Sequence, residues 1–119
     1  FLVEDNHAYR MVISRVLQKN GCIVMVFENG QKAADMIKYV RPNLIISDIE
    51  MPVMDGFKFC QHVRSNESNQ DIPFIFISST TSKQMIAKAN ELGTINMLSK
   101  PISIEKLKNV VNTMLTLRA

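Results

Sequence analysis

One aspartate lies where the carboxyl edge of a β-sheet would expose its side chain. Asp48 comes directly after Ser47 and the apolar run Leu44–Ile46, and the loop that follows contains Pro52 and Gly56. Open α/β sheets bind their ligands in the crevice beyond the carboxyl ends of the strands. If the run is a strand, Asp48 lies at that edge, and we therefore take it as the candidate reactive carboxylate.

Polar groups follow the other apolar runs in the same way. Acidic residues follow the first and second runs, hydroxyl side chains follow the fourth, and a lysine follows the fifth. These residues are Glu4, Asp5, Glu28, Asn29, Ser78, Ser79, Thr80, Ser99 and Lys100. Because parallel strands end at one edge of a sheet, we expect carboxylates, a hydroxyl cluster and a lysine to meet there.

Such a group of side chains is suited to phosphoryl transfer. The carboxylates of Glu4, Asp5 and Asp48 would repel one another at short range unless a cation lay between them. Oxygen ligands at a shallow site favour Mg²⁺, which often bridges protein carboxylates to a phosphate. Lys100 adds a second positive charge, so that both cations would stabilise a phosphoryl group in transit. Asp48 would then attack phosphorus and form an acyl phosphate.

Helix capping is the alternative explanation for the same residues. Asp5 precedes a helical stretch from Asn6 to Asn20, and the segment Ser78–Ser82 precedes another that contains Met85. Short polar side chains are common at such positions, and for each residue alone capping is the more frequent role. Separate strand ends that together supply one coherent phosphoryl site favour the chemical interpretation.

The order of the elements predicts the sheet that would bring these residues together. Five short apolar runs alternate with five stretches of helical period. The runs are Phe1–Val3, Cys22–Phe27, Leu44–Ile46, Phe74–Ile77 and Met97–Leu98. Their continuous apolar character is typical of strands buried on both faces. Parallel neighbours need crossover helices, so the pattern predicts a doubly wound α/β sheet of the (βα)5 type. With 119 residues, we expect one domain over 1–119.

Composition excludes several other classes of protein. Hydrophobic residues make up 46% of the chain and charged residues 21%, which is typical of a globular domain and not of a disordered one. No apolar run approaches the roughly 20 residues of a membrane span, and the chain does not begin like a signal peptide. Cys22 and Cys60 lack metal-ligand spacing with each other or with His7 and His62, which favours free thiols in a reducing cytoplasm.

The net charge of +3 is unevenly distributed. Residues 1–60 hold seven Lys/Arg and seven Asp/Glu, whereas residues 61–119 hold seven against four. A nucleic-acid surface normally combines clustered basic residues with aromatic stacking groups, and this half offers only Phe74 and Phe76, both in a strand run. We therefore expect no direct nucleic-acid binding and a mixed, solvated surface.

With these residues placed, the chain resembles the receiver domain of two-component response regulators over its entire length. The matching segments are 3–6, 48–52, 54–56, Ser78 and 99–101. Order and spacing agree with the family, with 30 residues from Asp48 to Ser78 and 22 from Ser78 to Lys100. The resemblance implies a flavodoxin-like fold with five parallel strands in the order 2-1-3-4-5.

The resemblance also implies roles for individual residues. Asp48 is the implied phosphoacceptor, taking its phosphoryl group from a phosphohistidine on a sensor kinase or a phosphotransfer protein. Glu4, Asp5, Asp48 and the backbone carbonyl of Glu50 are the implied Mg²⁺ ligands, and Lys100 pairs with the phosphoryl oxygens.

Further implied roles concern signalling. Ser78 is the implied switch hydroxyl, which turns inward to the phosphate, and Ser79 is the small residue required beside it. Pro101 is implied to follow a cis peptide. Such a domain catalyses its own phosphorylation and dephosphorylation but is a signal relay and not a conventional enzyme, and its last two helices and fifth strand form the surface that meets an output domain or downstream protein.

Two features depart from the family pattern. Many relatives carry an aromatic residue where Met97 stands; its flexible side chain can fill the same gap, but it does not reproduce the packing of a ring. Acidic residues that follow the glycine of the fifth strand in some dimeric relatives are absent from the segment 93–97. From residue 79 onward only Glu91 and Glu105 are acidic, against six Lys/Arg. We therefore expect a basic C-terminal face that meets an acidic partner through salt-sensitive binding.

Two rival functions remain to be compared with this one. A phosphatase of the haloacid dehalogenase type uses similar groups, but its nucleophile comes first in an Asp-x-Asp motif, whereas here the Glu4–Asp5 pair precedes Asp48. A receiver that acts only as an interaction module would not need the complete set of chemical residues. A lone receiver, a multidomain regulator and a hybrid kinase all stay open as the parent protein.

Overall fold

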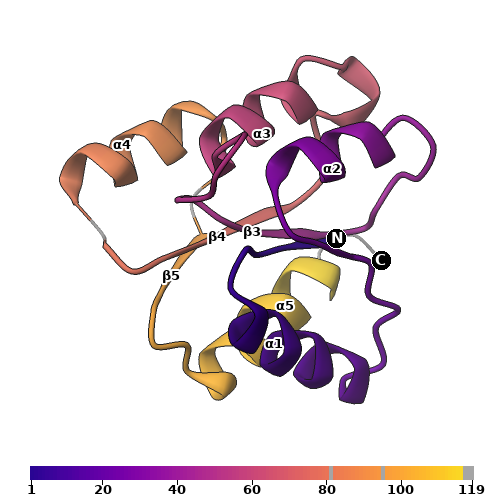
Figure 1. The fold of residues 1–119 in the computed structure, drawn as a ribbon, viewed down its shortest axis with the longest axis vertical. Helices are drawn as coiled ribbons and strands as arrows, with labels where there is room; N and C mark the ends of the chain where they lie inside the picture. The colour runs from indigo at the N-terminus through magenta and orange to yellow at the C-terminus, as the bar shows by residue number, and fades with distance from the viewer. Residues whose placement is uncertain (81, 95, 117–119) are drawn as a thin grey trace.

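A parallel sheet covered by helices on both faces forms the body of the molecule (Figure 1). The computed structural model describes residues 1–80, 82–94 and 96–116. Within these residues the strands run parallel in the order β2-β1-β3-β4-β5, which confirms the predicted α/β fold and strand order. The strands are β1 (Leu2–Val3), β2 (Val26–Phe27), β3 (Ile45–Asp48), β4 (Phe74–Ser78) and β5 (Asn96–Ser99).

Figure 1 shows α1 and α5 on one face of the sheet and α2, α3 and α4 on the other. The helices are α1 (His7–Lys19), α2 (Gly30–Met36), α3 (Gly56–Arg64), the short 3-10 helix η1 (Glu67–Asn69), α4 (Lys83–Glu91) and α5 (Ile104–Thr116). Each face has its own core. Ile13 and Leu107 pack in the α1–α5 layer, and Phe59 and Phe76 pack in the other layer. Burial of these apolar faces fixes the sheet between two helical layers.

Helix starts in the structure decide the capping question for the site residues. Asn6, not Asp5, is the N-cap of α1, since its side chain accepts a hydrogen bond from the Tyr9 N–H. Ser82, not Ser78, caps α4 through the Met85 N–H. Both Asp5 and Ser78 are therefore free of the capping role that the sequence left open for them.

Two elements are shorter than the sequence predicted. The run Cys22–Phe27 contributes only Val26–Phe27 to the sheet, and Ile23 is 99% exposed. β2 is an edge strand with β1 as its only neighbour, so a continuous apolar run there does not imply burial on both faces. The helical spacing of Ala33, Ala34, Ile37 and Val40 predicts a helix that continues to Arg41, but α2 ends at Met36, and Val40 lies beyond it and is exposed.

The methionines differ in how far they are buried. The apolar character of Met11, Met25, Met51 and Met54 predicts packing in the core or in loops. Met25, Met51 and Met54 do pack against the core, whereas Met11 is 48% exposed on α1. Among the described residues, no helix has both the length and the apolar character needed to cross a membrane.

Candidate functional site

Asp48 is the last residue of β3 and is almost completely buried. The residue is 4% exposed, and the backbone of β3 hydrogen-bonds to both of its neighbours in the sheet, β1 and β4. The Ile49 N–H donates to Asp48 Oδ1 at 2.8 Å, and Lys100 Nζ donates to Oδ2 at 3.0 Å. Each carboxylate oxygen thus has a fixed donor, and the side chain is held at the carboxyl edge of the sheet.

Lys100 connects Asp48 to the first strand. Its Nζ lies 2.8 Å from Glu4 Oε1 as well as 3.0 Å from Asp48 Oδ2, and it sits 4.5 Å from the centroid of the Tyr9 ring. The Lys100 N–H also donates to the Ser78 carbonyl, which ties the residue to the end of β4. Burial by itself would lower the pKa of Lys100, but its hydrogen bonds to Glu4 and Asp48 outweigh that effect and raise the pKa. Lys100 therefore stays an ammonium ion.

Three carboxylates gather at this edge of the sheet, two of them paired with that ammonium group. Glu4, Asp5 and Asp48 each place one oxygen within 4.8 Å of the others. Together with Lys100 they leave a formal charge of about −2, which matches a divalent cation. Glu4 is completely buried, and apart from the Lys100 ammonium group 2.8 Å away, its Oε1 has no hydrogen-bond donor within the described part of the chain. An oxygen of this kind is suited to a metal ligand.

The electrostatics of Glu4 reflect this crowding. Burial raises the pKa of its carboxyl group, the Lys100 hydrogen bond lowers it, and the neighbouring Asp48 raises it again, to about 7 in total. Near neutral pH the site therefore exchanges a proton in the absence of a cation. A bound cation would favour the ionised form.

The hydroxyl cluster lies beside this centre but is turned away from it. Ser78 is buried, and its Oγ lies 2.5 Å from the Thr80 carbonyl and 3.1 Å from Glu50 Oε1. Ser79 is exposed, with its Oγ 3.3 Å from Glu50 Oε2. The structure thus brings Glu4, Asp5, Asp48 and Lys100 together, with Ser78 on the adjacent strand and its hydroxyl directed to the loop.

The loop after β3 packs tightly against Asp48. Gly56 begins α3 with its N–H donating to the Ile49 carbonyl, and a Cβ at this position would lie 2.2 Å from the Asp48 carbonyl oxygen. Only glycine allows this approach. Val53 adopts a φ of 70°, and the Met54 N–H donates to the Pro52 carbonyl, so the loop contains a strained γ-turn. This turn begins two residues after Glu50, in the loop that connects the site to α3.

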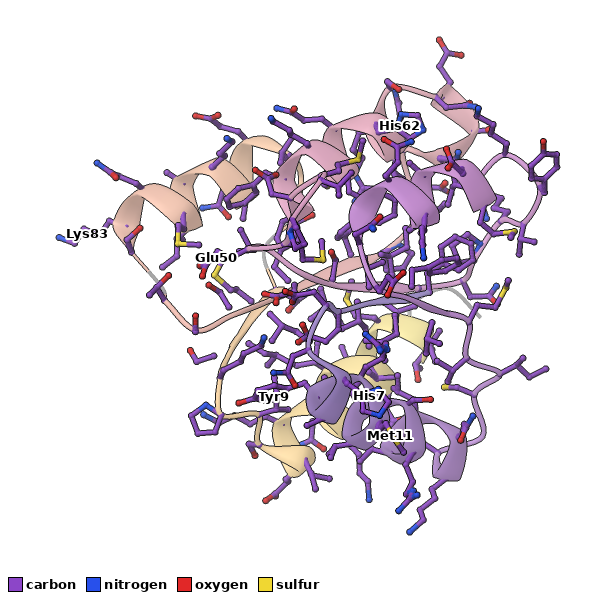
Figure 2. All side chains as sticks on the ribbon, in the orientation of Figure 1. His7, Tyr9, Met11, Glu50, His62 and Lys83 are labelled. Atoms are coloured by element: carbon purple, nitrogen blue, oxygen red, sulfur yellow. The ribbon has the colours of Figure 1, made fainter. Side chains whose placement is uncertain are left out.

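The remaining residues singled out from the sequence occupy varied positions. Met97 is partly buried against the core on β5 beside Phe76, and the peptide bond before Pro101 is cis. His7 is exposed at the start of α1, and His62 is exposed on α3 (Figure 2).

Three contributions were not anticipated from the sequence. Tyr9 lies against Lys100, Arg10 donates to the Glu4 carbonyl at 2.8 Å, and the Glu50 side chain accepts from hydroxyls after β4. The helical spacing of Tyr9 with Ile13 and Val16 indicates a residue on the inner face of a helix but does not show its partner. No sequence signal separates the Glu50 carboxylate from an ordinary exposed acid.

Comparison with known proteins is consistent with this geometry. The family model described as the response regulator receiver domain matches residues 1–112. A probable chemotaxis protein CheY from Rhizobium etli is 31% identical over 111 residues, 92% of this chain and 86% of that protein. The solved chemotaxis protein CheY4 of Vibrio cholerae is 30% identical, with a TM-score of 0.90 over 96% of this chain and 95% of that one. The chain belongs to the response regulator receiver domain family, a family of signalling domains of two-component systems.

Receiver domains of this family occur in proteins of very different length. The peroxide stress-activated histidine kinase mak1 of Schizosaccharomyces pombe is 31% identical over 120 residues, which cover 96% of this chain but only 7% of that kinase. A receiver of this size therefore exists both as most of a small protein and as a small part of a histidine kinase.

Proposed function

We propose that this domain relays a signal by reversible phosphorylation of Asp48 in the presence of Mg²⁺. The observation that carries the proposal is the position of the Asp48 carboxylate, which lies 3.0 Å from Lys100 Nζ and within 4.8 Å of oxygens from Glu4 and Asp5. A nucleophile, a fixed ammonium group and a set of acidic ligands are the parts that phosphoryl transfer to a carboxylate requires.

The transfer step uses a phosphohistidine of a sensor kinase or a phosphotransfer protein as donor. One Asp48 carboxylate oxygen forms a bond to phosphorus while the P–N bond of the donor breaks. The electron pair of that bond stays on the imidazole nitrogen, which takes up a proton from water. Lys100 remains paired with Asp48 and offers its charge to the phosphoryl oxygens, where negative charge is concentrated in the transition state. Attack of water on the acyl phosphate later returns inorganic phosphate and the free Asp48 carboxylate.

Glu4, Asp5, Asp48 and the backbone carbonyl of Glu50 would hold the Mg²⁺ ion. The formal charge of the cluster and the buried Glu4 Oε1 support this assignment. When bound, the ion supplies positive charge that neutralises the phosphoryl oxygens.

The response to phosphorylation involves the ends of β4 and β5. Ser78 turns its hydroxyl toward the phosphoryl group, Ser79 leaves room beside that group, and Met97 repacks against the core. Pro101 shapes the chain after Lys100. These changes alter the surface of α4, β5 and α5, where Lys83 points away from the molecule (Figure 2). The excess of lysine over Glu91 and Glu105 on these elements supports an acidic output domain or downstream partner.

The donor binds beside Asp48, on the side formed by α1 and the start of α5. A groove of about 350 Å³ there is lined mainly by apolar residues, among them Tyr9, Val12, Pro101 and Ile104. Tyr9 contacts Lys100, so this groove reaches the reactive centre.

We place the domain, over residues 1–119, in the cytoplasm, since both cysteines are free thiols.

Phosphoramidate tests the function without a cognate kinase, because it contains the same P–N bond as phosphohistidine. The chain is incubated with phosphoramidate and Mg²⁺, and its intact mass is followed with time. We expect the gain of one phosphoryl group, dependence on Mg²⁺, and no gain for Asp48→Asn. A chain that gains no phosphoryl group, or an Asp48→Asn variant that gains it equally, contradicts the proposal and favours a receiver that acts without phosphorylation.

A further inference from the structure

The side chain of Glu50 contacts three hydroxyl groups, one on the last residue of β4 and two on the residues that follow it. Thr80 Oγ1 donates to Glu50 Oε1 at 2.9 Å, Ser78 Oγ lies 3.1 Å from the same oxygen, and Ser79 Oγ lies 3.3 Å from Oε2. Figure 2 shows Glu50 on the side of the molecule where β4 runs into α4. No Lys or Arg forms an ion pair with Glu50 within the described residues, so its side chain is held through these hydroxyls.

Ser78 cannot keep these hydrogen bonds and also donate a hydrogen bond to a phosphoryl group on Asp48. A serine hydroxyl carries one proton and can donate one strong hydrogen bond. Its Oγ accepts from the Thr80 N–H at 3.1 Å, and the acceptors within reach of its proton are the Thr80 carbonyl and Glu50 Oε1. All of these partners lie in the loops after β3 and β4. A hydrogen bond from Ser78 to a phosphoryl oxygen on Asp48 therefore requires that the present contacts break.

We propose that the Glu50 carboxylate is a positioning residue that holds Ser78, Ser79 and Thr80 in the resting arrangement and thereby opposes the phosphorylated state. This inference rests on the proposed function of Asp48 and assigns a role to the side chain of Glu50, in addition to its backbone carbonyl. Phosphorylation adds negative charge two residues before Glu50 and offers Ser78 a competing acceptor. Both effects favour release of the hydroxyls, and the segment from β4 to α4 then becomes free to move.

The inference predicts an effect on the unphosphorylated protein itself. If Glu50 holds the resting arrangement, its removal raises the fraction of molecules in the competent state, and apparent affinity for a phosphoryl mimic rises by the same factor. Beryllium trifluoride, which binds an aspartate as a phosphoryl mimic, is the probe. Glu50→Ala keeps the backbone carbonyl but removes a nearby negative charge, so its Mg²⁺ affinity is measured separately and the mimic is titrated at saturating Mg²⁺.

The first measurement compares the free and the mimic-bound states of the wild type and of Glu50→Ala. Amide spectra of the ¹⁵N-labelled wild type and Glu50→Ala are recorded with and without beryllium trifluoride and Mg²⁺. We expect the Ser78, Ser79 and Thr80 amides of the free variant to be displaced toward the positions of the mimic-bound wild type. We also expect Glu50→Ala to bind the mimic about three to ten times more tightly than the wild type does.

Three further variants separate the hydrogen bonds from the charge. Glu50→Gln removes the charge but retains an acceptor oxygen, and should stay closer to the wild type than Glu50→Ala. Thr80→Val removes one hydroxyl without changing charge; it should shift the amides in the same direction as Glu50→Ala, less far, and add little in the Glu50→Ala background. Glu28→Ala removes another exposed acid that follows a strand and pairs with Lys32, and should have no effect on the amides of 78–80.

The outcomes distinguish this inference from the proposed function. If the wild type binds beryllium trifluoride but Glu50→Ala binds it equally or more weakly, or its free amides move in unrelated directions, the role of Glu50 is wrong and phosphorylation of Asp48 stands. An effect of Glu50→Gln equal to that of Glu50→Ala overturns the hydrogen-bonding role, because charge alone then explains the result. A wild type that does not respond to the mimic overturns both.

Discussion

The two halves of the carboxyl edge of the sheet are built differently. Around β1, β3 and Lys100, buried groups are held by several partners each, and Asp48 has a separate donor for each oxygen. After β4, exposed Thr80 and Ser79 are held through side-chain hydrogen bonds to a single exposed carboxylate, that of Glu50. Buried charge pairs are costly to disturb, whereas exposed hydroxyl contacts exchange readily with water. Under the proposed function, this difference would separate a rigid reactive centre from a segment that can respond to it.

Removing Lys100 should have the largest effect on the rigid half. Lys100→Met leaves the buried carboxylates of Glu4 and Asp48 without their shared cation, and we expect the free energy of unfolding to fall by about 3 kcal/mol at pH 8 without Mg²⁺. Urea denaturation measures this loss, and Mg²⁺ should restore part of it. The control Lys32→Met breaks an exposed ion pair with Glu28 and should be close to neutral. Equal effects of the two variants would remove the distinction between the buried and exposed parts of this edge.

Gly56→Ala should disturb the rigid half through packing alone. The added Cβ meets the Asp48 carbonyl oxygen and the Ile49 Cα, and we expect a loss of about 2 kcal/mol in the free energy of unfolding together with weaker binding of beryllium trifluoride. The control is Gly93→Ala, where φ is 76° but nothing lies within 4 Å of a Cβ, so that only backbone strain is added. If thermal denaturation shows that Gly56→Ala is as stable as the wild type, the close packing at Gly56 is contradicted.

The pH dependence of Mg²⁺ affinity sharpens the description of the reactive centre. Because the pKa of Glu4 is raised to about 7, the free protein binds a proton at Glu4 below that pH, and Mg²⁺ must displace it. Affinity should therefore fall as pH decreases below about 7, approaching tenfold per pH unit, and should be nearly constant above it. Isothermal titration calorimetry at a series of pH values measures this. In Glu4→Gln, Mg²⁺ affinity should no longer depend on pH in this range. If the Mg²⁺ affinity of the wild type is also independent of pH, the proton that competes with Mg²⁺ is not bound at Glu4.

The smallest effect should come from the responsive half. Thr80→Val removes an exposed hydroxyl and retains the size of the side chain, so we expect the free energy of unfolding to change by about 0.5 kcal/mol or less. Chemical denaturation of this variant beside Lys100→Met tests the comparison directly. A loss for Thr80→Val that approaches the loss for Lys100→Met would show that the segment after β4 is as rigidly built as the end of β3.

The sequence predicted the rigid half well because its arrangement follows from topology. Once parallel strands are expected, Glu4, Asp48 and Lys100 must end at one edge, whatever the details of packing. The parallel register places Asp48 opposite Ile77 and Ser78 opposite Ser99, directly before Lys100. The apolar runs carry enough information for this, since each strand end is marked by a change from apolar to polar residues.

The responsive half could not be predicted in the same way. The direction of the Glu50 side chain depends on hydroxyls 28 to 30 residues away and on a γ-turn at Val53, and neither has a sequence signature. The contact between Tyr9 and Lys100 was missed because helical spacing marks an inward face but not its partner. The edge strand β2 was overestimated for a related reason, since apolar character at Ile23 says nothing about which strand has a neighbour.

Locating the phosphoryl group on the chain tests directly whether Asp48 is the phosphoacceptor. The protein is treated with phosphoramidate and Mg²⁺, the acyl phosphate is reduced with borohydride to give a stable alcohol, and the modified residue is identified by peptide mass spectrometry. We expect the modification to lie at Asp48 and to disappear when Mg²⁺ is chelated. Modification at Glu4, Asp5 or Glu50 with Asp48 unmodified would contradict it.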